Sequence, residues 1–189
     1  MLHTAVLPFG GDHFTNDVAI GLRTSLEVAE AIKLAEGHAV PDHVDRKEQF
    51  ILADYGSSED EVVKRRFIAE VIEARAEEIF EAVDHELRKI DRSGMLPVGA
   101  VLTGGSIKLE GLADVAKRVL RLPVTVGEIR GVSSVIDEVN DPAYATAVGL
   151  ALWGFTIRAS SGRRFPSLKI GNFSQAADQA KKWIKSLIP

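Results

Sequence analysis

Residues 98–106 read VGAVLTGGS, and this stretch decides the fold class. Val98 to Leu102 is a short apolar run typical of a buried strand, and Thr103 to Ser106 is a glycine turn. Apolar residues then recur at helical spacing, at Leu112, Val115, Val119 and Leu120. A strand, a glycine turn and a helix in this order predict an α/β fold.

The first 37 residues predict one strand and two helices. Ala5 to Phe9 is an apolar run, which Gly10-Gly11-Asp12 ends before a helix that begins near residues 15–16. The second helix begins at a capping box, Thr24 to Glu27, and ends at Gly37. Its buried stripe would consist of Leu26, Ala29 and Ile32, or a neighbouring residue.

A second lobe begins at His38, where the sequence becomes polar and contains proline. Gln49 to Leu52 predicts a strand, and Tyr55 to Ser58 predicts a turn. A helix of about six turns follows, with its apolar stripe at Ile68, Val71, Ile72, Ile79, Val83 and Leu87. Arg75 falls on this stripe, so its guanidinium must either snorkel to solvent, which is the commoner case, or meet a partner.

The C-terminal third predicts a strand and two further helices. Val124 to Ile129 is the strand, and Asn140-Asp141-Pro142 begins a helix, capped by Asp141, that ends at Gly154. Arg158 to Asn172 has the polar composition of a tether. The last helix would place an apolar face, Phe173, Ala176, Ala177, Ala180, Trp183, Ile184, Leu187 and Ile188, opposite Lys181, Lys182 and Lys185. Such a helix either lies in a lipid headgroup layer or docks on the domain, and the preceding tether favours the membrane.

The composition excludes several classes of protein. A chain of 189 residues that is 46% hydrophobic can bury a core, and the absence of cysteine excludes a disulfide scaffold. A formal net charge of -4 gives no sign of the basic surface that binds nucleic acid. The histidines form no H-E-x-x-H motif, which would indicate a zinc site. No apolar stretch reaches the roughly 18 residues of a membrane span, and Met1 to Gly11 lacks the layout of a signal peptide.

Two local motifs are compatible with a nucleotide but do not require one. The Gly104-Gly105 turn would let backbone approach a flat ligand, although many strand-to-helix turns use glycine for shape alone. Glu30 and Lys33 share a helix face and could hold a ribose and a purine edge; by spacing alone a surface ion pair is the more frequent outcome. Neither G-x-G-x-x-G nor G-x-x-x-x-G-K-[ST] is present.

Several stretches, taken together and in order, resemble FtsA, the actin-like cell division protein. They are GGDHFTNDVAIGLRT at 10–24, EAIK at 30–33, GHA at 37–39, AEVIEAR at 69–75, VLTGG at 101–105 and VNDPAYATAVGL at 139–150. The resemblance implies the second half, incomplete, of an actin-like ATPase (RNase H-like) fold. Residues 1–37 and 98–157 would form subdomain IIA, and 38–97 an α+β lobe like subdomain IIB. Residues 158–172 would be a linker, and 173–189 a C-terminal amphipathic helix that targets the membrane.

The resemblance also implies a ligand, which is ATP, together with Mg in the intact family. The implied nucleotide contacts are Gly104, Gly105 and Ser106 against the adenosine, Glu30 and Lys33 near the base and ribose, and Gly10 and Gly11 toward the phosphates.

Two partners follow from the same resemblance. The second lobe would receive the acidic, apolar tail of FtsZ, the tubulin-like ring protein. Lys64, Arg65 and Arg66 would then be steering contacts, or else a solvated cationic helix start. Membrane lipids would contact Phe173, Trp183, Ile184, Leu187, Ile188 and the three lysines Lys181, Lys182 and Lys185. The expected location is cytoplasmic, peripheral on the inner membrane at the division site, with self-association through uncovered strand edges as a further expectation.

One departure limits the expected chemistry. The first actin-like half, the inserted domain and the phosphate loop of the type D-I-G-G-G-T-T-D do not occur in these 189 residues. We therefore expect no hydrolysis by this chain alone. The expected function is to link the FtsZ ring to the membrane, with a partial ATP site; the alternative is half of a split or truncated ATPase that needs an upstream partner.

Overall fold

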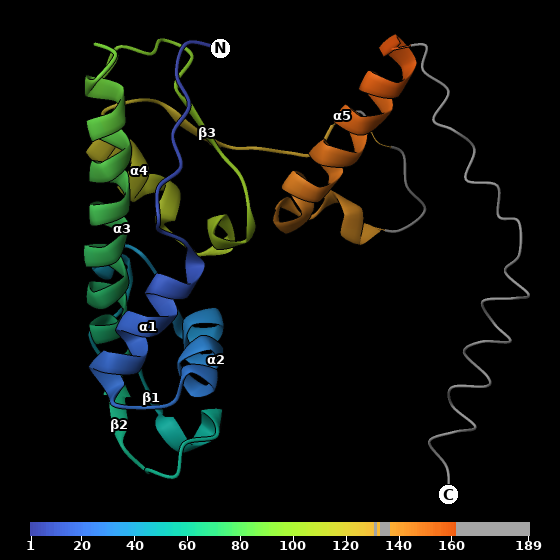
Figure 1. Cartoon of the computed structure of the whole chain (residues 1–189). Coiled ribbons are helices and arrows are strands. Elements are labelled where there is room, and N and C mark those ends of the chain that lie inside the picture. Colours follow the sequence, from blue (N-terminus) through green and yellow to red (C-terminus); the bar gives the residue numbers. More distant parts are fainter. Residues whose placement is uncertain (131, 133–136, 162–189) are drawn as a thin grey trace, which may run out of the picture. The chain divides into compact units, whose positions relative to one another are not determined.

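The structure is a computed structural model that describes residues 1–130, 132 and 137–161. It divides into two compact units, Met1–Val148 and Gly149–Pro189, and each is described by itself. In the first unit the longest helix, α3 (Arg65–Arg88), packs against α1 (Gly11–Leu22) and α4 (Leu112–Leu120) (Figure 1).

The two N-terminal helices are α1 and α2 (Leu26–Glu36). α1 begins one turn earlier than predicted, because the Gly10 N–H donates to His13 Nδ1 at 3.2 Å and Gly10 O accepts from His13 N. α2 is capped by Ser25, whose Oγ accepts from Val28 N at 3.3 Å, and ends at Gly37 as predicted. With Ser25 as the cap, Leu26 occupies the first helical position and is 56% exposed, so its predicted burial is wrong and Val28 takes its place in the core.

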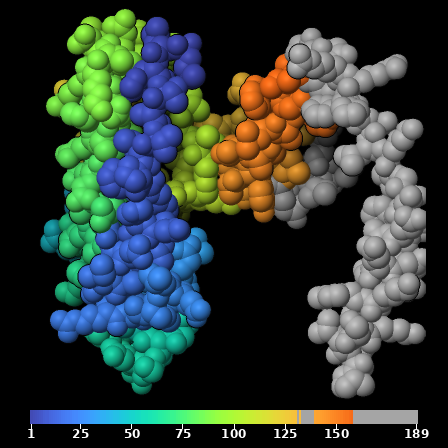
Figure 2. All heavy atoms as spheres, viewed as in Figure 1, coloured from blue at the N-terminus to red at the C-terminus, as the bar shows by residue number. Residues whose placement is uncertain are grey.

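The strand predicted at Ala5 to Phe9 is also wrong. These residues form no strand, and Val6 and Phe9 are exposed. A strand requires a partner for its N–H and C=O groups, and no described residue pairs with this segment. The residues just before this segment lie beside α3, where His3 Nε2 is 3.0 Å from Glu86 Oε2; Figure 2 shows the blue N-terminal atoms against green ones.

Residues 38–97, predicted to form a second lobe, contain a short hairpin and α3. β1 (Gln49–Ile51) and β2 (Val62–Lys64) pair antiparallel, with buried Phe50 opposite buried Val63, and η1 (Pro41–His43) and η2 (Leu52–Tyr55) flank β1. The predicted strand at 49–52 and the predicted six-turn helix are therefore confirmed.

The strand, glycine turn and helix that decide the fold class form a parallel unit. β3 (Ala100–Leu102) pairs with β4 (Val124–Val126), and η3 (Gly105–Lys108) and α4 lie between them in the chain. This β-α-β order confirms the predicted α/β class. η4 (Asp137–Asn140) and η5 (Pro142–Tyr144) follow, and the Asp141 side chain caps η5 by accepting from Ala143 N at 2.9 Å.

The final described helix, α5 (Ala145–Ser161), continues through Gly154. The predicted end at Gly154 is wrong, because one glycine weakens a helix by only about 1 kcal/mol and apolar residues continue beyond it. The predicted membrane helix at 173–189 lies outside the described residues. Within the described residues, no helix is long and apolar enough to cross a membrane.

One hydrophobic core joins the elements of the first unit. Its most deeply buried side chains come from α1, α2, α3, α4 and η2: Val18, Ile32, Leu52, Ile68, Ile72, Val115 and Leu120. The core holds the start of α1, one face of α2 and the glycine turn in fixed positions, which creates the site described next.

Candidate functional site

A cavity of about 650 Å³ opens between the start of α1, one face of α2 and the η3 turn. Its lining brings together five residues predicted as nucleotide contacts from separate parts of the sequence: Gly11, Glu30, Lys33, Gly105 and Ser106. The other two, Gly10 and Gly104, each immediately precede a lining glycine and do not line the cavity themselves.

The glycines permit a close approach between α1 and the η3 turn. A Cβ added to Gly11 would lie 2.7 Å from Ser106 Oγ, closer than real Cβ atoms come to another heavy atom. Gly104 has a φ of +110°, a conformation that residues with a Cβ rarely adopt. Glycine at both positions therefore shapes this wall of the cavity.

Glu30 and Lys33 form part of a partly buried triad with Thr15 of α1. Lys33 Nζ lies 2.5 Å from Glu30 Oε2 and donates to Thr15 Oγ1 at 2.9 Å, while the Thr15 hydroxyl donates to Glu30 Oε2. The Lys33 side chain is only 13% exposed. The pair is therefore more than the surface ion pair that spacing alone favours.

The triad also determines the charge state of Glu30. Burial raises the pKa of its carboxyl, but the hydrogen bonds from Lys33 and Thr15 outweigh this effect and hold the pKa below its ordinary value. Sequence reasoning missed Thr15. The available signal was a polar residue within the buried stripe of α1, beside Phe14 and Val18.

Next to the cavity, residues 38–40 pack against residues 110–111. Ala39 N donates to Glu110 O at 2.7 Å, and His38 Nδ1 accepts from Val40 N at 2.9 Å. Burial lowers the pKa of His38. Gly111 has a φ of +78°, and a Cβ there would lie 2.7 Å from His38 Cε1. Both the conformation and the contact favour glycine at position 111.

The three basic residues at the start of α3, Lys64, Arg65 and Arg66, differ in their ion-pair partners. Arg65 lines the large cavity and pairs with Glu48 at 2.7 Å and Glu36 at 3.3 Å. Arg66 pairs with Asp42 at 2.9 Å and Glu70 at 3.2 Å. Both arginines are thus held by carboxylates of the same chain, and neither is a simply solvated cation.

Lys64 differs from its two neighbours. It is exposed at the end of β2, and within the described part of the chain it forms no ion pair. It lines a second cavity of about 410 Å³ together with Arg23, Val62 and Phe67. This combination of two cations with apolar side chains was not predicted from the sequence.

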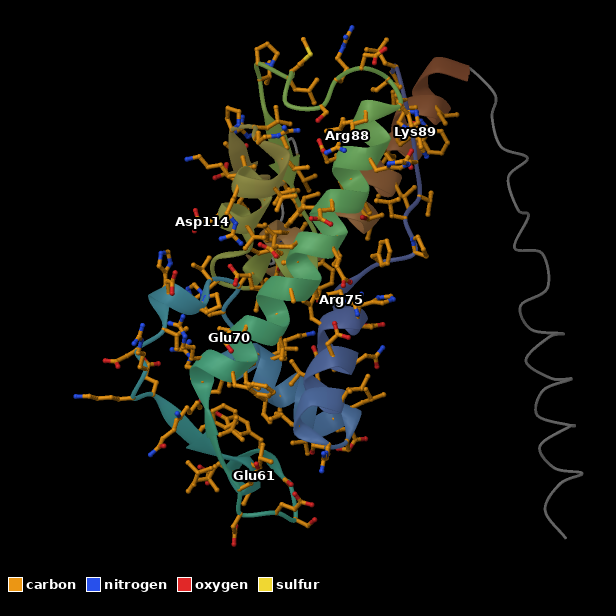
Figure 3. The ribbon with its side chains drawn as sticks, turned by 90° about the vertical axis from the view of Figure 1, so that its left-hand side faces the viewer. Glu61, Glu70, Arg75, Arg88, Lys89 and Asp114 are labelled. Atoms are coloured by element: carbon orange, nitrogen blue, oxygen red, sulfur yellow. The ribbon has the colours of Figure 1, made fainter. Side chains whose placement is uncertain are left out.

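Arg75 meets a partner, which is the less common of the two alternatives for this residue. Its Nε and Nη2 donate to the two carboxylate oxygens of Asp17 at 2.5 and 2.8 Å, and its Nη1 donates to Glu78 at 2.7 Å. Figure 3 shows Arg75 on α3 beside α1. The residue therefore joins α1, which begins at the cavity, to α3.

A family comparison decides the identity of this arrangement. The model of the family described as cell division protein FtsA matches residues 1–149. The chain belongs to the FtsA family. The predicted resemblance is thus confirmed, and the cavity lies wholly within the part of the chain that matches the FtsA model.

Individual FtsA proteins match most of this chain. FtsA of Pseudomonas aeruginosa is 35% identical over 179 residues, which cover 95% of this chain and 42% of that protein. FtsA of Bacillus subtilis is 38% identical over 161 residues, which cover 85% of this chain and 35% of that protein. FtsA of Escherichia coli K12 is 35% identical over 159 residues, which cover 80% of this chain and 38% of that protein. The chain therefore spans about two-fifths of the length of these FtsA relatives.

Solved structures confirm the actin-like fold. MreB5 of Spiroplasma citri bound to ADP superimposes with a TM-score of 0.62 at 18% identity, covering 84% of this chain and 48% of that one. The same protein bound to AMPPNP superimposes with a TM-score of 0.60 at 17% identity, covering 82% of this chain and 46% of that one. At this identity the likeness establishes a partial actin-like fold.

Proposed function

We propose that this chain forms the adenosine side of an ATP site, within an FtsA-type protein that links the FtsZ ring to the membrane. The observation that carries the proposal is the shared cavity, in which the Glu30–Lys33 pair faces the same space as the Gly105–Ser106 turn. A glycine turn lets a flat base approach the backbone, and the neighbouring carboxylate and ammonium offer an acceptor and a donor to sugar hydroxyls.

The hydrogen-bond inventory leaves capacity for a ligand. Glu30 Oε2 accepts from both Thr15 and Lys33, whereas no described residue donates to Glu30 Oε1. The ammonium of Lys33 has three donors, and two of them are used within the triad. One acceptor and one donor on the cavity wall are therefore available to a ribose.

The phosphate end of the site is less complete. Gly11 lines the cavity at the start of α1, where backbone N–H groups favour an anion. The described residues contain no cluster of three or more His, Cys, Asp or Glu side chains that could hold a metal ion.

Calorimetric titration with ATP tests this proposal. We expect saturable binding that weakens in Glu30→Ala, because this change removes the free acceptor and releases Lys33. Glu27→Ala is the matched control, since Glu27 is an exposed carboxylate at the start of the same helix. Absence of a binding heat up to about 1 mM ATP, or equal weakening in both variants, would contradict the proposal.

The second cavity supports the FtsZ part of the proposal. An acidic, apolar tail fits a surface that combines Lys64 and Arg23 with the exposed side chains of Val62 and Phe67. Because carboxylates of the chain already pair with Arg65 and Arg66, we assign the main electrostatic contribution to Lys64.

A titration with a peptide of the FtsZ tail tests this surface. Lys64→Glu should weaken binding by about tenfold, through both the loss of attraction and new repulsion. Lys47→Glu makes the same change of charge on an exposed loop residue and should leave binding within about twofold. Equal effects of the two variants would remove the assigned role from Lys64.

The alternative function is half of a split or truncated actin-like ATPase that needs an upstream partner for nucleotide hydrolysis. Phosphate release by this chain, measured alone and with a polypeptide that supplies the remaining length, separates the two. Turnover that requires the second polypeptide would favour the alternative.

A further inference from the structure

We propose that Thr15 is a positioning residue of the adenosine site: its hydroxyl fixes the Glu30–Lys33 pair so that Glu30 Oε1 is presented to a ribose hydroxyl. This inference rests on the proposed nucleotide function and adds to it a residue on a different helix. The three side chains come from two elements, Thr15 from α1 and the ion pair from α2.

The Thr15 hydroxyl is directed away from its own helix. A threonine inside a helix commonly donates to the carbonyl four residues earlier, which here is Gly11 O. That distance is 3.4 Å, near the limit for a hydrogen bond, whereas Glu30 Oε2 lies closer. Since a hydroxyl has one proton, Thr15 donates it to Glu30 and uses its lone pairs to accept from Lys33 at 2.9 Å.

Burial makes this arrangement rigid. Thr15 is 7% exposed, and its branched Cβ restricts its side chain to few rotamers. Glu30 is more exposed, and an i,i+3 pair on a helix surface would by itself leave its carboxylate in several rotamers. The fixed hydroxyl holds Oε2 of Glu30, which lines the cavity, and leaves Oε1 without a donor among the described residues.

This geometry predicts that the site selects ribose. An acceptor held for a sugar hydroxyl discriminates against a sugar that lacks it, because the acceptor is then left without its partner. We therefore expect the 189-residue chain to bind ATP about tenfold more tightly than 2′,3′-dideoxy-ATP. We also expect the preference to depend on the hydroxyl at position 15.

The experiment compares the dissociation constants of both nucleotides in two matched pairs of variants. Wild type and Thr15→Val differ in a hydroxyl at nearly constant shape, and Thr15→Ser and Thr15→Ala differ in a hydroxyl after loss of the methyl. Wild type and Thr15→Ser should retain the tenfold preference, whereas Thr15→Val and Thr15→Ala should bind both nucleotides within about twofold of each other. The serine–alanine pair suffices if the valine variant does not fold.

A second readout requires no nucleotide. The carboxyl of Glu30, followed by NMR in the free protein, should titrate at higher pH in Thr15→Val than in wild type, because one of the donors that lower its pKa is removed. Thr15→Ser should titrate like wild type.

The outcomes separate this inference from the proposed function. If wild type binds neither nucleotide, the nucleotide site itself fails, and the positioning role with it. If wild type prefers ATP and Thr15→Val keeps the same preference, only the positioning role is overturned. An equal loss of affinity for both nucleotides in Thr15→Val, with an unchanged Glu30 titration, would mark Thr15 as a structural residue and also overturn the inference.

Discussion

The guanidinium of Arg75 forms a bidentate ion pair with the carboxylate of Asp17, in which Nε donates to Oδ2 at 2.5 Å and Nη2 donates to Oδ1 at 2.8 Å. The two side chains are 23% and 22% exposed, so solvent screens the pair only partly. Asp17 belongs to α1, whose first residue lines the proposed nucleotide cavity, and Arg75 belongs to α3, whose Phe67 lines the proposed partner surface. This ion pair therefore joins the two helices that contribute residues to the two proposed sites.

Removal of the link should destabilise the protein. We expect Arg75→Ala to lower the free energy of unfolding by about 1–2 kcal/mol, because Asp17 would keep its burial and lose two charge-assisted hydrogen bonds. Arg46→Ala removes an exposed arginine and should change the free energy by less than about 0.5 kcal/mol. Urea denaturation of the two variants measures the difference, and similar midpoints would show that the pair contributes little.

Gly111 should tolerate a side chain less well than Gly56. Both have positive φ, at +78° and +92°, so alanine at either position costs about 1 kcal/mol of backbone strain. A Cβ at Gly111 would in addition lie 2.7 Å from His38 Cε1, whereas nothing lies within 4 Å of one at Gly56. In thermal unfolding, the melting temperature of Gly111→Ala should be well below that of Gly56→Ala. Equal melting temperatures would contradict the described packing around His38.

His38 should make stability depend on pH. Burial, together with His43 and Arg65, lowers the pKa of His38 in the folded state, against an opposing effect of Glu110 and Asp114. The unfolded chain then binds a proton first, near pH 6.5, so the stabilisation is complete above that pH and is lost as the pH falls toward the folded pKa. The free energy of unfolding should decrease by at most about 1.4 kcal/mol per pH unit in this window.

Two histidine-to-glutamine variants test whether His38 causes this pH dependence. His38→Gln should remove the slope below pH 6.5, while His85→Gln, at an exposed position on α3, should retain it. Denaturant unfolding between pH 7.5 and about pH 5 measures both. A slope that persists in His38→Gln would assign the dependence to other groups.

The terminal segment should bind lipid. We expect the change of Trp183 and Ile184 to glutamate to abolish co-sedimentation with anionic liposomes, because the apolar face of the predicted helix is lost. The control variant changes Gln175 and Gln179 to glutamate. It adds the same number of negative charges on the polar face of the predicted helix and should only weaken binding. Lys181, Lys182 and Lys185 should each contribute roughly 1 kcal/mol with anionic lipid, so high salt should reduce binding. Unchanged sedimentation of the Trp183 and Ile184 variant would refute the membrane role.

The sequence predicted the α/β class and α3 because hydrophobic periodicity is a local signal. The stripe at Ile68 and Ile72 and the run at Val98 to Leu102 contain enough apolar residues to identify a helix and a strand without knowledge of their neighbours. The strand predicted at Ala5 to Phe9 fails for the converse reason, because strand formation depends on a partner that the described residues do not supply.

Side-chain partners across the fold could not be predicted in the same way. The pairing of Thr15 with Glu30, of Arg65 with Glu48, and of Arg75 with Asp17 joins residues from different elements. Such contacts follow from the packing angles of α1, α2 and α3, which periodicity does not determine. The family resemblance indicated Glu30 and Lys33, but only the fold shows that a hydroxyl from α1 completes the pair.

The central claim is that the Glu30–Lys33 pair and the Gly105–Ser106 turn bind one ligand. The direct test is a titration of the ¹⁵N-labelled chain with ATP, followed by amide chemical shifts. We predict saturable shifts at Gly11, Glu30, Lys33, Gly105 and Ser106 with a common dissociation constant, and small shifts in the β1–β2 hairpin. Shifts confined to other surfaces, or shifts at the turn without shifts on α2, would contradict the claim.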